Sequence, residues 1–508
     1  MDCLNLFDGS VTGGTLALLV LCLAIALAFE FVNGFHDTAN AVATVIYTKS
    51  LKPGPAVVWS GIMNFLGVFF GTIIGGAAVA FGIVHLLPVD LLASTGQSVG
   101  LLMVLSLLLS AIIWNVGTWY FGLPASSSHA LLGSILGVGL SASLVSGRGL
   151  AAGMNWGQVQ KVGLTLLISP LFGFACAALL FLLFKLFLKD RRLYEEPKGE
   201  EPPPPFIRGL LFLTCTLVSF FHGSNDGQKG VGLIMLILIG LLPAQYALNP
   251  AIDGAKTAET AAIIRRLDTT ITKHGGDAKL SDNLEKIATQ LETASSGVKG
   301  MPEAERANIR ALALKTDSAL TKWEKATELS EDEAKDVKTA HKQINGLTDY
   351  VVKWIPFAVA LALGIGTMVG WKRIVVTVGE KIGKTHLTYA QGAAAELVAA
   401  ATIYAADKMG LPVSTTHVLS SGVAGTMAAN RAGLQTKTVR NIALAWVLTL
   451  PVTMLLAGTL FALTAGPLMR NAPPSTAATP SSKTLPQRDV RLQARTVSDI
   501  EPNRAERR

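Results

Sequence analysis

The sequence is poor in charge. Asp, Glu, Lys and Arg make up only 15% of its 508 residues, whereas 50% are hydrophobic. A soluble domain usually carries about 25% charged residues, so this composition excludes an ordinary soluble protein. A helix needs about 20 apolar residues to cross a bilayer, and most of the continuous apolar runs reach that length. These runs are 12–32, 56–84, 97–121, 159–187, 206–221, 231–243, 352–370, 386–406 and 441–465. We therefore expect an all-α polytopic membrane protein.

Cysteine is also scarce, and the signatures of enzymes are missing. The four cysteines have no paired spacing, so we expect neither a disulfide framework nor a metal site. Segment 223–229 superficially suggests a phosphate loop, but it lacks the G-x-x-x-x-G-K-[ST] spacing. We predict a protein that is not an enzyme and that needs no cofactor.

The net charge of +8 does not indicate nucleic acid as a partner. The basic residues gather in loops that flank the apolar runs, where they set the membrane topology. The most basic loop, 185–208, is expected in the cytoplasm. With an odd number of crossings in each half, the N-terminus and the long polar segment 244–350 then lie outside.

Two short motifs each occur twice, in the same order. GFHDTAN at 34–40 pairs with GSNDGQK at 223–229, and GLPASSSH at 122–129 pairs with GLPVSTTH at 410–417. Polar, helix-breaking motifs duplicated inside apolar sequence are typical of secondary transporters built from internal repeats. We predict two inverted repeats of about five crossings each, with broken helices and the substrate site where the halves meet.

The spacing of the motifs locates an insertion. Asp37 and Ser127 are 90 residues apart, whereas Asp226 and Thr415 are 189 apart. The excess falls in the polar segment, where 280–295 and 303–329 have the pattern of amphipathic helices. The predicted organisation is a first repeat at 1–184, a basic Pro-rich linker at 185–208, the start of the second repeat at 209–243, a soluble helical insertion at 244–350, the remainder of the second repeat at 351–468, and a disordered tail at 469–508.

Acidic side chains at membrane depth are costly and are therefore functional by default. Asp37 and Asp226 each lie three residues after a glycine, at positions where we expect the helix to break. A broken helix exposes backbone groups that a cavity or a substrate must satisfy. With Asn40, Asn225 and Glu396, these carboxylates are expected to hold a co-bound cation or to move protons.

The hydroxyl triplets indicate an oxyanion site. Ser126, Ser127 and Ser128, and again Ser414, Thr415 and Thr416, follow Gly-Leu-Pro at a predicted helix start. A helix N-terminus offers free N–H groups and the positive end of the helix dipole to an anion. Close packing of small residues is the alternative role.

Four of the eight histidines lie in the four motifs. Histidine titrates near neutral pH and suits proton coupling, although a capping or packing role is the alternative. These histidines are His36, His129, His222 and His417.

With these residues in place, the chain resembles the inorganic phosphate transporter (PiT) family, and in particular bacterial low-affinity Pit-type carriers. The resemblance rests on segments 33–41, 122–129, 222–226, 379–383 and 410–417. It implies symport of phosphate with a cation, and it transfers the substrate residues of the family onto Asp37, Asp226, Ser126, Ser414 and Glu396. The first-half partner of Glu396 falls at Asn64, 27 residues after Asp37.

The resemblance also bears on the coupling ion. His36 and Asn64 depart from the pattern of the sodium-coupled eukaryotic relatives, which favours protons. The resemblance to bacterial Pit carriers implies uptake of phosphate as a neutral metal complex, so a divalent metal ion is a further expected partner. We predict a proton-coupled importer of inorganic phosphate in a bacterial inner membrane. The alternatives are a sodium-coupled phosphate or sulfate symporter and a membrane-anchored binding or sensing module. Beyond the lipid bilayer, a homo-oligomer is left open.

Overall fold

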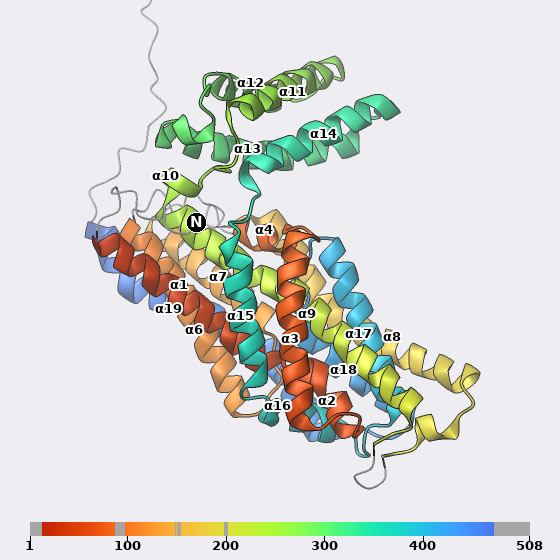
Figure 1. Cartoon of the computed structure of the whole chain (residues 1–508). Coiled ribbons are helices and arrows are strands. Elements are labelled where there is room, and N and C mark those ends of the chain that lie inside the picture. The colour runs from red at the N-terminus through yellow and green to blue at the C-terminus, as the bar shows by residue number, and fades with distance from the viewer. Residues whose placement is uncertain (1–12, 87–96, 148, 150–153, 198–201, 472–508) are drawn as a thin grey trace, which may run out of the picture. The chain divides into compact units, whose positions relative to one another are not determined.

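The computed structural model describes residues 13–86, 97–147, 149, 154–197 and 202–471 (Figure 1). Within these residues the secondary structure is helical, and the predicted all-α class is confirmed. Residues up to Arg470 form one compact unit. The apolar helices are α1 (Gly13–Asp37), α2 (Ala39–Tyr47), α3 (Pro53–Ile73), α4 (Ala78–Val84), α6 (Gln97–Tyr120), α7 (Ser127–Val145), α8 (Trp156–Phe187), α9 (Pro205–Leu241), α15 (Trp354–Met368), α16 (Lys372–Glu380), α17 (Tyr389–Lys408), α18 (Thr415–Ala429) and α19 (Thr436–Asn471).

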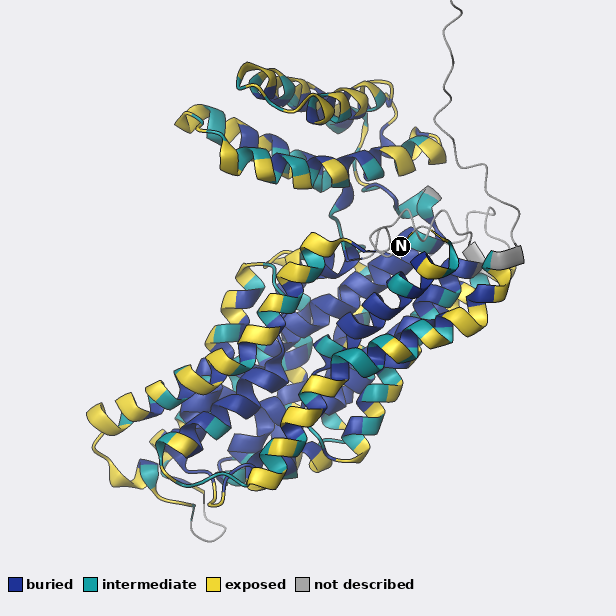
Figure 2. Cartoon of the chain, turned by 180° about the vertical axis from the view of Figure 1, so that it is seen from behind, coloured by how far each residue is buried: buried dark blue, intermediate teal, exposed yellow. Residues whose placement is uncertain are grey.

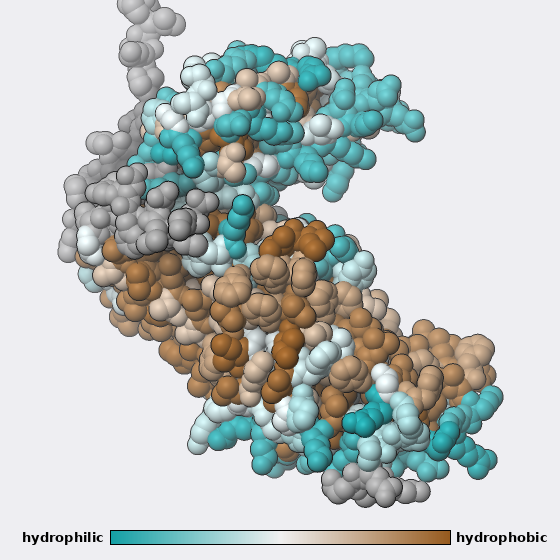
Figure 3. All heavy atoms as spheres, viewed as in Figure 1, coloured by the Kyte–Doolittle hydropathy of each residue, from teal (hydrophilic) through white to brown (hydrophobic). Residues whose placement is uncertain are grey.

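In the part of the chain that the structure describes, seven helices, counting α1 and α2 as one span, are long and apolar enough to cross a membrane, and α15 with α16 forms an eighth candidate bent by 64°. Leucine side chains remain exposed along α8 and α19, and α8 also exposes phenylalanines, as expected of surfaces that face lipid. Figure 3 shows this apolar surface over the helical body, and Figure 2 shows the buried interior that it encloses. Helices α17 and α18 are not among these candidate spans, so the ten crossings stay a prediction.

The elements follow one another in the same order in both halves. The series α1–α2, α3, α4, α6, α7, α8 is matched by α9, α15, α16, α17, α18, α19, and each duplicated motif lies at the same step of its series. The inverted relation between the two halves stays a prediction.

The expected helix break at Asp226 is wrong. Helix α9 runs without interruption from Pro205 to Leu241, whereas the first copy does divide, into α1 and α2, directly after Asp37. No proline interrupts α9 around the motif, and its glycines face α3 closely. A Cβ built on Gly223 would lie 2.2 Å from the Asn64 carbonyl oxygen. Close helix contact of this kind stabilises a glycine-rich stretch that propensity alone would weaken.

The polar insertion is helical, as predicted. Its helices are α10 (Pro243–Tyr246), α11 (Gly254–Lys273), α12 (Ala278–Glu292), α13 (Glu303–Ala326) and α14 (Glu331–Thr348). Helices α12 and α13 correspond to the two predicted amphipathic segments, and their buried leucines and isoleucines form a core of their own with α11 and α14. Helix α8 extends to Phe187 and α19 to Asn471, slightly beyond the predicted domain limits. The predicted disordered tail lies almost entirely outside the described residues.

Candidate functional site: two helix starts that meet

Each Gly-Leu-Pro loop ends one helix and begins the next. Gly122 and Gly410 have φ values of +66° and +64°, the left-handed conformation that closes a helix C-terminus. In both loops the glycine N–H donates to the carbonyl three residues earlier, and the leucine N–H donates to the carbonyl five residues earlier at 2.9 Å. The duplicated glycine is therefore explained by the same turn in both copies.

The serine after each loop caps the next helix. The hydroxyl oxygens of Ser126 and Ser414 accept the backbone N–H of His129 and His417, each at 3.2 Å. These caps confirm the predicted helix starts. The first N–H groups of each helix have no partners inside the helix. Such groups are available to an anion.

The two helix starts lie against each other. The imidazole rings of His129 and His417 have centroids 4.6 Å apart, and the ring of Trp446 packs against His417 with a centroid distance of 4.2 Å. The Ser128 hydroxyl donates to the Val413 carbonyl across the two loops at 3.3 Å. Motifs that are almost 290 residues apart in the sequence are thus in direct contact in the fold.

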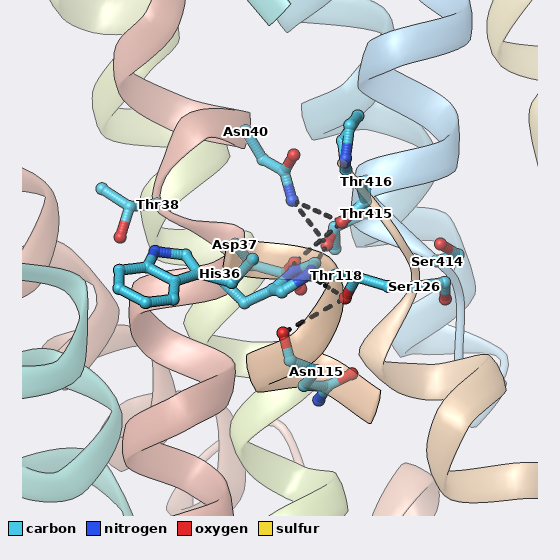
Figure 4. Close-up of polar contacts among 12 residues, drawn as sticks. His36, Asp37, Thr38, Asn40, Asn115, Thr118, Ser126, Ser414, Thr415 and Thr416 are labelled. Carbon is cyan, nitrogen blue, oxygen red and sulfur yellow. Dashed lines mark hydrogen bonds and ion pairs between the residues drawn. The ribbon is translucent and has the colours of Figure 1, made fainter. Parts of the chain in front are cut away.

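Asp37, the last residue of α1, lies beside the first residues of α18 (Figure 4). Its carboxylate accepts hydrogen bonds from the Thr416 hydroxyl at 2.8 Å and from the Thr415 hydroxyl at 3.5 Å. The neighbouring His36 ring is 3.1 Å from the same carboxylate and 3.1 Å from the hydroxyl of Thr118 on α6. Two of the three hydroxyl groups in the second triplet therefore already donate hydrogen bonds to Asp37.

Lys229 is a residue of this polar cluster that the sequence analysis did not name. Its buried ammonium group donates to Asp226 at 2.8 Å, to the Ser128 hydroxyl and to the Val413 carbonyl at 3.1 Å. It thereby joins the second acidic motif to both loops. The sequence did offer a signal, because Lys229 is the only lysine or arginine in the four motifs. A lysine inside a membrane segment is functional by default.

His222 stands between the two aspartates. Its Nε2 lies 3.6 Å from an Asp37 carboxylate oxygen and 3.7 Å from one of Asp226, while its Nδ1 is 2.8 Å from the Asn64 side-chain oxygen. The ligand atoms of His222 and the two aspartates lie within 4.8 Å of one another, a geometry able to hold a cation. The sequence had suggested no metal site, because these groups come together only in the fold.

The two motif asparagines hold the second loop. Asn40 donates to the hydroxyls of Thr415 and Thr416 at 3.2 and 3.0 Å. The side-chain oxygen of Asn225 accepts the Val413 N–H at 3.3 Å, and the NH2 group of Asn225 donates to the Leu411 carbonyl. Asn225 therefore positions the loop backbone.

Glu396 and Asn64 are not counterparts in the two halves, contrary to the sequence analysis. Glu396 lies on α17 and accepts the hydroxyls of Thr44 and Thr214, whereas Asn64 lies on α3 and contacts His222. By element order, α17 corresponds to α6 and α3 to α15. The error arose because spacing was counted from Asp37 without knowledge of the helices between.

A further acid was missed. Asp407, at the end of α17, accepts the Ser224 hydroxyl at 2.9 Å and the Gln228 amide at 2.7 Å. It links the second acidic motif to the helix before the second loop. The sequence did offer a signal for Asp407, because this acid lies only three residues before Gly410 of the second loop.

The fold and this site define the class of the protein: a helical membrane transporter, with a buried polar site between two helix starts. The duplicated motifs assemble that site from both halves of the chain.

Comparison with known proteins specifies the family. A model described as the phosphate transporter family matches residues 33–457. The chain is 41% identical to the low-affinity inorganic phosphate transporter PitB of Escherichia coli (strain K12), over 90% of this chain and 98% of that protein. It is 42% identical to PitA of the same strain, over 87% and 96%. The solved structure of a sodium-dependent phosphate transporter superimposes with a TM-score of 0.51 at 19% identity, covering 88% of this chain and 98% of that one. The chain belongs to the phosphate transporter family, so it is a transporter and not an enzyme.

Proposed function

We propose that the protein imports inorganic phosphate across a bacterial inner membrane by symport with protons. The observation that carries the proposal is the place of His222 between Asp37 and Asp226, at 3.6 and 3.7 Å. The imidazole of His222 therefore faces both buried carboxylates at an oxyanion site, and histidine is the side chain that most often serves in proton transfer. Low-affinity inorganic phosphate transporters among the relatives support phosphate as the substrate.

The helix starts supply the phosphate contacts. The hydroxyls of both triplets and the N–H groups of two helix N-termini are donors suited to tetrahedral oxyanions. Several buried polar atoms at this site have no hydrogen-bond partner among the described residues, and a ligand would satisfy them. They are Ser127 Oγ, Asn40 Oδ1, His222 Nε2 and Asp226 Oδ2.

The charges of the site favour symport over uniport. The site contains two carboxyl groups, Asp37 and Asp226, but one lysine, Lys229, which pairs with Asp226. A phosphate anion entering this site would face net negative charge at low dielectric, where repulsion is strong. A proton on the histidine or a bound cation removes that repulsion, so anion and cation bind together.

Protons and a divalent metal ion fit the site better than sodium does. Sodium is a hard cation that takes oxygen ligands, whereas the cluster of Asp37, His222 and Asp226 includes an imidazole. Imidazole suits transition metals, so a metal ion carried with phosphate as cargo could lie here. Sodium coupling remains the second candidate, because the superimposed structure is a sodium-dependent transporter.

Alternating access would follow from two repeats that rock against each other around the site. The matched element order of the two halves supports this arrangement.

Uptake of radioactive phosphate into proteoliposomes tests the coupling. We expect accumulation under an imposed pH gradient without sodium, and no response to a sodium gradient at equal pH. The variant His222→Gln should lose the pH response, while the control His386→Gln, an exposed histidine outside the motifs, should keep it. Uptake that follows sodium and ignores the pH gradient would contradict proton coupling, and competition by sulfate at equal concentration would contradict the phosphate assignment.

A further inference from the structure

A second carboxyl group lies deep in α1, outside the motifs. Glu30 precedes Asp37 by seven residues, so it lies two turns away on the same helix. Its side chain has an exposed fraction of 0%, and neither carboxylate oxygen has a hydrogen-bond partner. Buried polar groups are almost always hydrogen-bonded, so an unpartnered buried carboxyl requires an explanation.

The space for this carboxyl exists only because residue 230 is glycine. A Cβ built on Gly230 of α9 would lie 2.4 Å from the Glu30 carboxyl carbon. Helix α9 therefore packs directly on the carboxyl group, one residue beyond Lys229. The Asn33 side chain, one turn along α1, approaches the carboxyl, but the contact lies outside ordinary hydrogen-bond geometry.

The charged groups that face Glu30 belong to the transport site. They are Asp226 and Lys229 on α9 and Asp37 on its own helix. Helices α2, α6 and α15, which also pack against α1, contain no acidic, basic or histidine residue, and α7 contributes only His129. The charge of Glu30 is therefore sensed mainly by the residues that bind phosphate and its partner ion.

We propose that Glu30 binds and releases a proton that is coupled to phosphate transport. This inference rests on the proposed proton symport and adds a second proton-binding residue to His222. With Lys229 positive and both aspartates negative, an ionised Glu30 gives these four groups a charge of −2, and a protonated Glu30 gives −1. The protonated form is therefore the one that admits an anion.

The same charge balance gives the direction of coupling. A proton on Glu30 raises the affinity for phosphate, and bound phosphate raises the affinity of Glu30 for its proton by the same factor. Ionisation of Glu30 also provides Lys229 with a second carboxylate, which competes with Asp226 for the ammonium group that contacts Ser128. Loss of the proton thus loosens the contact between α9 and the first hydroxyl triplet.

The variant Glu30→Gln separates phosphate binding from proton coupling. Glutamine keeps the size of the side chain and imitates the protonated form. In proteoliposomes, exchange of external for internal phosphate needs no net proton release, so the variant should keep it. Accumulation driven by a pH gradient should fall by about tenfold or more, within the usual 5- to 150-fold range of such couplings. The control Glu328→Gln, at an exposed carboxylate of the insertion, should keep both.

A second variant addresses a failure to fold. Glu30→Asp restores a carboxyl group, and it should restore accumulation with a displaced pH profile of exchange. Exchange and accumulation lost together in Glu30→Gln, with no recovery in Glu30→Asp, would overturn the proposal. Full pH-driven accumulation by Glu30→Gln would also overturn it while leaving proton symport intact. Wild-type protein that ignores the pH gradient would instead refute the proposed function itself.

Discussion

The buried pair of Lys229 and Asp226 gives the sharpest test of the site. Both side chains have exposed fractions of 3% or less, and their charged atoms are 2.8 Å apart. Removing one member of such a pair leaves a buried charge without a partner, which typically costs about 3–5 kcal/mol. We therefore expect Lys229→Met to lower the free energy of unfolding by about 3–5 kcal/mol and to abolish phosphate uptake.

A double-mutant cycle isolates the interaction. Asp226→Asn alone leaves Lys229 as an unpaired buried cation, so it should be destabilising and should also abolish uptake. The double variant removes both charges, and its loss should be smaller than the sum of the single losses by about 1–3 kcal/mol. Transport should stay absent in the double variant, because the site has then lost both its acid and its base.

Equilibrium unfolding in mixed micelles measures the stabilities, and membrane insertion is checked by the yield of purified protein. Lys229→Arg is the matched control for charge, and it should recover part of the stability but not the three-way contact with Ser128 and Val413, because a planar guanidinium does not replace a compact ammonium group. A coupling energy below about 0.5 kcal/mol, the limit for independent sites, would refute the reasoning.

Three further predictions concern the loops and the insertion. Gly410→Ala should destabilise the protein by about 1–2 kcal/mol, because an alanine at φ +64° is strained, whereas Gly209→Ala inside α9 has open space and should be neutral or stabilising in thermal unfolding. Ser414→Ala removes a helix cap and should cost about 1 kcal/mol, and an unchanged denaturation midpoint would contradict this. The hydrogen bond with Asp317 raises the pKa of His341, so its stabilisation is complete below its ordinary pKa of about 6.5 and is lost as the pH rises through the raised value. Hydrogen exchange of α13 and α14, corrected for the intrinsic rate, should accelerate above that pH in wild-type protein, and the same acceleration in His341→Gln would contradict this assignment.

The sequence was sufficient for what each motif does locally. Glycine, proline and serine at fixed spacing specify a helix end, an extended residue and a helix cap, so the starts of α7 and α18 could be predicted from Gly122 to Ser126 and from Gly410 to Ser414. The insertion was also predictable, because its composition is soluble and two of its helices are amphipathic.

The sequence was not sufficient where packing decides. Glycines around Asp226 suggested a break, yet contact with α3 keeps α9 straight through the motif. The partners of Lys229 and the lack of a hydrogen-bond partner at Glu30 depend on which helices meet, which local spacing does not record. The mistaken match of Asn64 to Glu396 has the same origin.

Proton coupling of phosphate import is the central claim, and counting fluxes tests it most directly. Phosphate, proton, sodium and divalent-metal movements should be measured together in one proteoliposome preparation, with the membrane voltage clamped. We predict a fixed ratio of protons to phosphate that does not change when sodium is replaced by choline. Phosphate entry without accompanying protons, or in a fixed ratio to sodium, would contradict the account.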